Sequence, residues 1–128
     1  YLKTSCLILL LLISIVAGCS STKVQNVSVE EIHIPENSIG SARAALAKDM
    51  VYSVDRFIQR NLACSQWSLE NVTESKAVGQ LVFTQDGQLY RGEVSEKWTL
   101  QQCGKMLTLN LDITPNPQGG SFIRIAIK

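Results

Sequence analysis

The sequence has one histidine and no excess of either charge, and both scarcities exclude classes of function. Its 12 basic and 11 acidic residues nearly balance, whereas a nucleic-acid-binding domain needs a clustered basic surface. The single histidine, His33, has no second histidine or cysteine at a spacing that metal sites use, and no neighbouring nucleophile that it could activate. We therefore expect no nucleic-acid partner, no metal and no cofactor.

Motifs that carry catalysis are also missing from the sequence. It has no Gly-rich loop for phosphate, because Gly119-Gly120 follow two prolines and predict a turn. Glu93 and Glu96 would point to opposite faces of a strand, so they do not form a catalytic pair. Glu96 has the parity of a core-facing residue, and we expect it at the margin of a sheet or bonded to a helix rather than acting as an acid.

One long hydrophobic run stands near the N-terminus and ends in a distinctive tetrapeptide. Residues 5–17 carry no charge and follow Lys3, which is typical of a signal peptide. Polar residues from Ser20 onward arrive too early for a membrane-spanning helix, which needs about 20 apolar residues. Val16-Ala17-Gly18-Cys19 closes the run and resembles the lipobox of bacterial lipoproteins. An uncleaved N-terminal anchor is the alternative interpretation.

The lipobox resemblance implies how this end of the chain is processed. Residues 1–18 would be removed as the signal peptide, and acyl chains on Cys19 would provide the contact with the membrane. In lipoproteins, a serine after the lipidated cysteine, here Ser20, goes with sorting to the outer membrane. We expect residues 19–36 to form a lipid-anchored tether and residues 37–128 a single domain in the cell envelope, facing the periplasm.

Four cysteines are present, and the lipoprotein interpretation leaves two of them to form a pair. Cys6 is removed with the signal peptide, and Cys19 takes the lipid. Cys64 and Cys103 then remain in an oxidising compartment, where paired cysteines form disulfides. Because these two are not in C-x-x-C spacing, a structural disulfide is favoured over a redox-active one.

The spacing of apolar residues predicts one amphipathic helix. Between Ile39 and Ile58 apolar residues recur every three or four positions, and charged residues stand between them. Asn37 or Ser38 is expected to cap the start of this helix, which should end near Asn61 or Leu62.

After the helix the apolar period changes to two, which indicates strands. The segment Leu81 to Val94 is typical of a hairpin that turns at Asp86-Gly87. A second turn is predicted at Gly104-Lys105, and Ile123, Ile125 and Ile127 indicate a last strand. The expected opposite pairs are Phe83 with Tyr90, Leu100 with Leu109, and Trp98 with Leu111.

The expected disulfide places the segment from Cys64 to Leu69. If this segment runs antiparallel beside the end of the long strand Leu89 to Gln102, a bridge to Cys103 is possible. Residues 71–76 would then form a bulged interruption. One register satisfies three pairs: Cys64 with Cys103, Trp67 with Leu100, and Leu69 with Trp98. The predicted fold is α+β, with one amphipathic helix on a roughly four-stranded antiparallel sheet and a cross-strand disulfide.

Exposed apolar residues on the outer face of this sheet indicate a partner surface. Met106 and Phe122 are expected there among polar residues, with Arg124 beside them, and the last strand would have a free backbone edge. Ordinary surface scatter is the alternative interpretation. The expected partner is another protein of the envelope.

Three short motifs in the C-terminal part form a further pattern: Glu96-Lys97-Trp98, Cys103-Gly104-Lys105 and the turn from Pro115 to Gly120. This pattern resembles small uncharacterised envelope proteins of Gram-negative bacteria. The resemblance implies a secreted domain with a disulfide, and it implies no activity.

These features predict a non-enzymatic outer-membrane lipoprotein that acts as a protein-interaction or assembly-support module. The alternative is a lipid-anchored inhibitor or small-ligand-binding protein with a role like that of the lysozyme inhibitors, which have a similar size and a disulfide. A third class, a small hydrolase, would need a nucleophile and a base that the sequence does not reveal.

Overall fold

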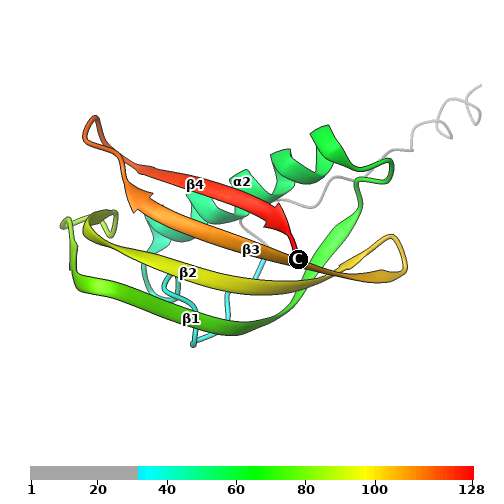
Figure 1. The fold of residues 1–128 in the computed structure, drawn as a ribbon, viewed down its shortest axis with the longest axis horizontal. Coiled ribbons are helices and arrows are strands. Elements are labelled where there is room, and N and C mark those ends of the chain that lie inside the picture. Colours follow the sequence, from blue (N-terminus) through cyan, green and yellow to red (C-terminus); the bar gives the residue numbers. More distant parts are fainter. Residues whose placement is uncertain (1–31) are drawn as a thin grey trace, which may run out of the picture.

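One helix and four strands follow each other along the chain in the computed structural model, which describes residues 32–128. Within these residues the strands pair with their sequence neighbours in the order β1-β2-β3-β4, and every pair is antiparallel (Figure 1). The predicted α+β fold is therefore confirmed. The elements are α2 (Ala44–Asn61), β1 (Trp67–Phe83), β2 (Leu89–Gln102), β3 (Lys105–Pro115) and β4 (Ser121–Ile127).

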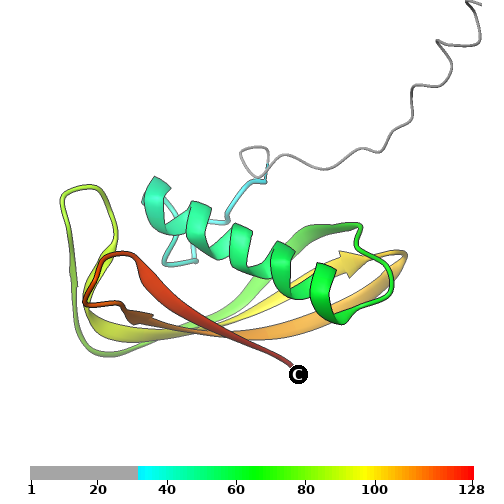
Figure 2. The same cartoon turned by 90° about the horizontal axis from the view of Figure 1, so that it is seen from above.

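The helix lies across one face of the sheet, so the molecule has two layers (Figure 2). Four of its buried residues recur every fourth position and form one stripe, which Val51 widens: Leu46, Met50, Val54 and Ile58. They join fully buried side chains of the two central strands in one core: Trp98, Leu100, Leu109, Leu111 and Ile113. Each such side chain contributes about 1.5–3 kcal/mol on burial, so contact between the layers is the main source of stability.

The helix begins later than the sequence predicts. The expected start is Asn37 or Ser38, but α2 begins at Ala44, after a series of turns. Ala42 has a φ of 63°, a left-handed conformation that does not continue a right-handed helix. The Ser38 hydroxyl donates to a carboxylate of the sheet instead of capping the helix. The predicted end is confirmed, because α2 ends at Asn61.

The β1–β2 hairpin differs from the prediction at its turn. Phe83 lies opposite Leu89 rather than opposite Tyr90. The loop is wider than two residues, because the Thr84 N–H donates to the Gln88 carbonyl and the Thr84 hydroxyl accepts from the Gln88 N–H. Leu89 is therefore buried in the core, whereas Tyr90 is 62% exposed.

A bulge in the same hairpin depends on Gly92. Its φ is +91°, and a Cβ at this position would lie 2.7 Å from the carbonyl oxygen of Gln80 and 2.7 Å from the side chain of Leu81. Only a residue without a Cβ allows the two strands to approach in this way. The pairing of β1 with β2 shifts here, between Val78 and Val82. After the bulge, the even-numbered side chains of β2 point into the core from Val94 onward.

The β2–β3 turn lies one residue earlier than predicted. Cys103 and Gly104 are its central residues, with φ of 51° and 83°, as the two-residue turn with positive φ at both positions requires. Each pair is therefore shifted by two residues: Leu100 lies opposite Leu107, and Trp98 lies opposite Leu109. The side chains remain on their predicted faces, because only a shift by an odd number of residues would exchange the faces.

The register of β1 against β2 also differs by two residues from the prediction. The observed pairs are Trp67 with Gln102 and Leu69 with Leu100. The cause is the position of the cysteines, since Cys64 lies in the loop before β1 and Cys103 lies in the β2–β3 turn. The disulfide thus joins the ends of elements rather than a paired position within two strands.

The remaining strand predictions have mixed outcomes. Residues 71–76, predicted as an interruption, are paired with β2 as part of β1. The bulged character is present, because the register shifts between Leu69 and Asn71 and again between Val72 and Glu74. The last strand forms at residues 121–127 as predicted.

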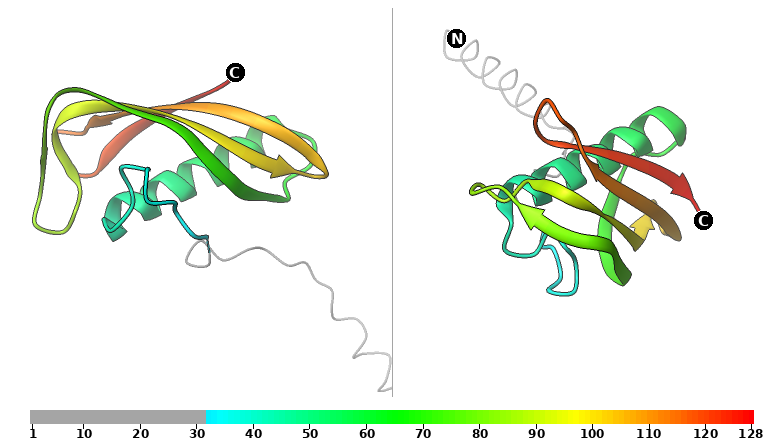
Figure 3. Two further views of the ribbon diagram at one scale, coloured as in Figure 1. Left: turned by 90° about the horizontal axis from the view of Figure 1, so that it is seen from below. Right: turned by 60° about the vertical axis from the view of Figure 1, so that its left-hand side comes forward.

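The segment before α2 lies on the helix side of the sheet (Figure 3). Ile32 and Ile34, which the sequence assigns to the tether, are partly buried against the core. Ser38 and Ile39 are buried. This segment therefore completes the core beside the helix.

Candidate functional site

The lipidation site predicted at Cys19 lies outside the described residues. The same is true of the whole Val16-Ala17-Gly18-Cys19 motif and of residues 1–18. Lipidation and cleavage therefore stay predictions from the sequence. In the part of the chain that the structure describes, no helix is long and apolar enough to cross a membrane.

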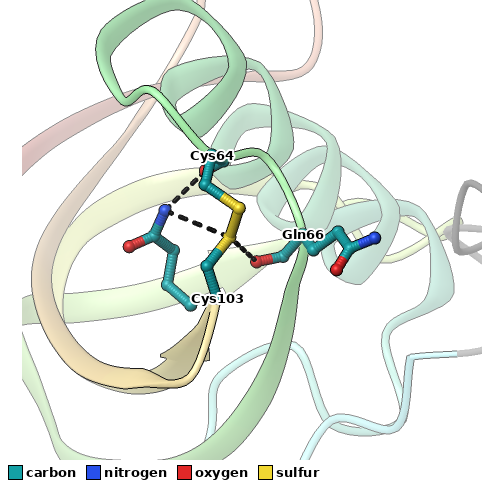
Figure 4. Close-up of a disulfide and its surroundings, with 4 residues drawn as sticks. Cys64, Gln66 and Cys103 are labelled. Carbon is teal, nitrogen blue, oxygen red and sulfur yellow. Dashed lines mark hydrogen bonds between the residues drawn. A yellow bond between two sulfur atoms is a disulfide. The ribbon is translucent and has the colours of Figure 1, made fainter.

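The predicted disulfide between Cys64 and Cys103 is confirmed (Figure 4). Their Cα atoms lie 6.2 Å apart, within the usual range for a disulfide. The Cys103 N–H donates to the Gln66 carbonyl at 3.1 Å, and the Gln102 side-chain amide donates to the Cys64 carbonyl. The bridge therefore fixes the entry into β1 against the β2–β3 turn, which is a structural role.

Glu96, on β2, has a carboxylate that is buried and fully hydrogen-bonded. Its side chain is 2% exposed. Oε1 accepts from the Ser38 hydroxyl at 2.8 Å and from the Trp98 indole N–H at 2.9 Å. Oε2 accepts from the Ile39 backbone N–H at 2.5 Å and from the Ser75 hydroxyl at 2.7 Å. Four donors from three parts of the chain thus converge on one carboxylate.

This environment gives Glu96 a structural role. A general acid or base needs access to a substrate, whereas both oxygens of Glu96 are occupied by donors of the protein itself. The expected place at the sheet margin is wrong, because Glu96 lies on the second of four strands. The expected bond to the helix is made instead to Ser38 and Ile39, in the segment just before α2. The alternation of side chains along the strand identified Glu96 as core-facing. No sequence signal pointed to Ser38 and Ser75 as its donors, because both lie in segments distant from Glu96 in the chain.

His33 lines a cavity of about 340 Å³ at the start of β1, and its side chain is exposed. Pro35, Trp67 and Leu69 form much of the remaining wall. Within residues 32–128, no group of three or more histidine, cysteine, aspartate or glutamate side chains could hold a metal ion.

The residues predicted for the partner surface lie on the outer face but not in one patch. Met106 and Phe122 are each 56% exposed. Phe122 pairs with Thr114 and Arg124 with Asp112, so these two outer-face residues are neighbours. Met106 lies eight residues before Thr114 on β3, which is about 26 Å along a strand. The structure therefore groups Phe122 with Arg124 and separates both from Met106.

The outward edge of β4 is unpaired among the described residues, since β3 is its one neighbour in the sheet of residues 32–128. The Lys128 N–H donates to the Thr108 carbonyl at 2.9 Å, which fixes the alternation of hydrogen bonds along β3 and β4. By this alternation Ile123 and Ile125 direct their backbone N–H and C=O groups away from β3.

A groove of about 300 Å³ lies between α2 and this edge. Ile123 and Ile125 of β4 line one side, and Phe57 of α2 lines the other. Of the four strands, β4 brings its Cα atoms closest to those of α2. The sequence did not reveal the groove, because the same apolar spacing assigns all three side chains to the core.

Two arginines of α2 also line the groove. Arg56 and Arg60 are one helical turn apart and point to the same side of the helix. The Arg56 guanidinium donates to the Tyr52 hydroxyl at 3.2 Å and lies 5.3 Å from the centre of the Tyr52 ring. The groove thus combines an apolar floor with a cationic rim.

Comparison with known proteins gives no match to a family model, to a curated protein or to a solved structure.

Proposed function

We propose that this protein is a non-enzymatic outer-membrane lipoprotein whose domain binds another envelope protein through the edge of β4. The observation that carries the proposal is the open edge of this strand, with exposed apolar side chains beside it. Phe122 is 56% exposed and Ile127 is 50% exposed. Open strand edges bind extended segments of partner proteins, because their backbone groups lack a partner.

The β4 edge suits such binding better than β1, the opposite edge of the sheet. The pairing of β3 with β4 has no register shift, whereas that of β1 with β2 has four. β1 carries the charged side chains of Glu74 and Lys76, and the Asn37 amide donates to the Val72 carbonyl. Bulges, charges and covering groups all oppose the addition of a strand.

The sequence supports the location of this module. Val16-Ala17-Gly18-Cys19 resembles the lipobox, and Ser20 goes with sorting to the outer membrane. Residues 20–31, between Cys19 and the segment packed against the core, would reach about 40 Å if fully extended. The domain would then be free to meet proteins at some distance from the membrane surface.

Site-specific photo-crosslinking in cells tests the proposal. A crosslinker in place of Phe122 is expected to trap one specific envelope protein, and a crosslinker in place of Met106 tests whether the contact extends to the far end of β3. A crosslinker in place of exposed Glu70, on β1, is the matched control and is expected to trap none. The absence of a specific adduct at Phe122 would contradict the proposal.

An assay of lysozyme inhibition separates the proposal from its alternative. The mature protein is expected to leave lysozyme activity unchanged. Inhibition at equimolar amounts would replace the interaction module with an inhibitor of the lysozyme-inhibitor kind.

A further inference from the structure

We infer that the groove between α2 and β4 binds an extended acidic segment of the partner protein, which joins the sheet as a fifth strand. This inference rests on the proposed function and adds the chemistry of the partner. Two independent features carry it: the direction of the free backbone groups and the charge of the groove.

The backbone of β4 is set to receive a strand on the side where the groove opens. Ile123 and Ile125 direct free N–H and C=O groups to this side, and the side chains of the same two residues line the groove. In a paired strand, residues opposite these isoleucines direct their side chains to the same face of the sheet. Alternate side chains of an added strand would therefore enter the groove beside Phe57.

The charge of the groove selects acidic side chains. Among residues 32–128, no carboxylate lies within 4.0 Å of Arg56 or Arg60. The Tyr52 hydroxyl accepts from Arg56 and orients its guanidinium at the rim. Guanidinium groups form strong, directional hydrogen bonds with carboxylates.

The spacing of the two arginines matches that of an extended segment. Side chains one helical turn apart are separated by about 6 Å, and side chains two residues apart on one face of a strand by about 6.6 Å. α2 and β4 run in the same direction along the groove (Figure 1). Asp49, two helical turns before Arg56 and outside the lining of the groove, lies near Gly120. Two acidic residues in i and i+2 positions therefore fit at the Ile125 end, with apolar residues toward the Gly120 end.

Titration with a designed peptide tests the inference on the full mature chain. The probe is an acetylated and amidated nonapeptide of alternating valine and threonine, with aspartate at two successive valine positions. Fluorescence anisotropy is expected to show saturable binding at low salt. A peptide with asparagine at both positions is expected to bind about tenfold more weakly, and the difference should shrink in 0.5 M NaCl because exposed charges are screened.

Variants of the protein separate the two features. Arg56→Gln combined with Arg60→Gln should remove most of the preference for aspartate over asparagine, whereas Arg91→Gln, an exposed arginine on β2, should not change it. Ile125→Pro removes one outward N–H and should abolish binding of both peptides. Edge strands tolerate proline where the N–H faces outward.

Modified peptides keep the test valid if Ile125→Pro fails to fold. N-methylation of every second peptide nitrogen removes the donors on one edge of the peptide. One of the two alternate methylation patterns should abolish binding and the other should preserve it. Equal binding of both patterns would overturn strand addition.

Three further results would overturn the inference. The first is no binding at peptide concentrations up to about 1 mM, which corresponds to a binding free energy weaker than about 4 kcal/mol. The second is equally tight binding of a peptide with the sequence of residues 20–31, which would assign the groove to this chain's own N-terminal segment. The third is self-association of the protein that Ile125→Pro abolishes, which would assign the groove to a second copy.

The outcomes for the groove and for the proposed function are distinguishable. A partner trapped at Phe122 in cells, with a yield that Ile125→Pro reduces but the arginine variants leave unchanged, would leave the proposed function standing and overturn the acidic groove. Peptide binding in the groove without any specific adduct in cells would do the reverse.

Discussion

The hydroxyl of Ser38 donates a 2.8 Å hydrogen bond to the carboxylate of Glu96, 58 residues later in the chain. The bond joins the segment before α2 to the second strand of the sheet. Ser75 of β1 donates to the other oxygen of the same carboxylate. A single buried side chain thus connects the N-terminal segment with two strands.

Replacement of Glu96 by glutamine is expected to destabilise the domain. An amide NH2 group would face donors where a carboxylate oxygen now accepts, and buried donors would lose their acceptor. We expect the free energy of unfolding to fall by about 2–4 kcal/mol, measured by urea denaturation followed by circular dichroism. Glu93→Gln, an exposed residue on the same strand, is the matched control, and equal midpoints for the two variants would contradict a central role for Glu96.

Gly92→Ala is expected to cost more stability than Gly79→Ala. Both glycines have positive φ, but a Cβ at position 92 meets the Gln80 carbonyl at 2.7 Å, whereas nothing lies within 4 Å of a Cβ at position 79. The backbone conformation alone should cost Gly79→Ala about 1–2 kcal/mol, and the contact should add to that in Gly92→Ala. Thermal denaturation of both variants checks this, and a smaller loss for Gly92→Ala would show that the bulge does not depend on close approach.

Removal of the disulfide by Cys64→Ser with Cys103→Ser is expected to lower stability without changing the fold. The bridge closes a loop of 39 residues in sequence separation, for which the chain-entropy relation gives about 4 kcal/mol. Urea denaturation should show the loss, and reducing agent should destabilise the natural protein but not the variant. A free-thiol signal from the untreated natural protein would contradict the pairing.

Cys19→Ser is expected to abolish association with membranes. The proposed anchor consists of acyl chains on this one thiol, and the mature chain has no charge excess that would bind it to anionic lipid. In cell fractionation, the variant should be recovered in the soluble fraction, whereas the natural protein should be recovered in the membrane pellet. Retention in the pellet would exclude lipidation as the anchor.

The faces of the sheet were predictable from the sequence, whereas the registers were not. Alternation placed Trp98, Leu100, Leu109 and Leu111 on the core face, where they are buried. The registers depended on the position of each turn, and an error of one residue at Cys103-Gly104 moved every pair of that hairpin by two. At the first hairpin, side-chain hydrogen bonds of Thr84 widened the loop and brought Leu89 into the core in place of Tyr90.

In the helix and the candidate site as well, some features follow from the local sequence and others depend on contacts with distant parts of the chain. Periodicity predicted the end of α2, but its start depends on Glu96, which binds Ser38 and Ile39 from a distant strand. The groove beside β4 likewise depends on the separation between α2 and that strand. Such separations result from packing of the whole core, and local sequence carries no direct signal for them.

The Glu96 contacts also determine how the domain responds to mechanical tension. A pull on the N-terminal side of the domain reaches Ser38 and Ile39 before it reaches α2, and their bonds pass the load directly to β2. Because β2 is flanked by β1 and β3, the force is shared across the sheet and does not first unwind the helix. The Cys64–Cys103 bridge in turn shortens the length of chain that can be stretched out if the sheet gives way. A chain held at its N-terminus and loaded at the β4 edge would therefore resist extension at the centre of its sheet.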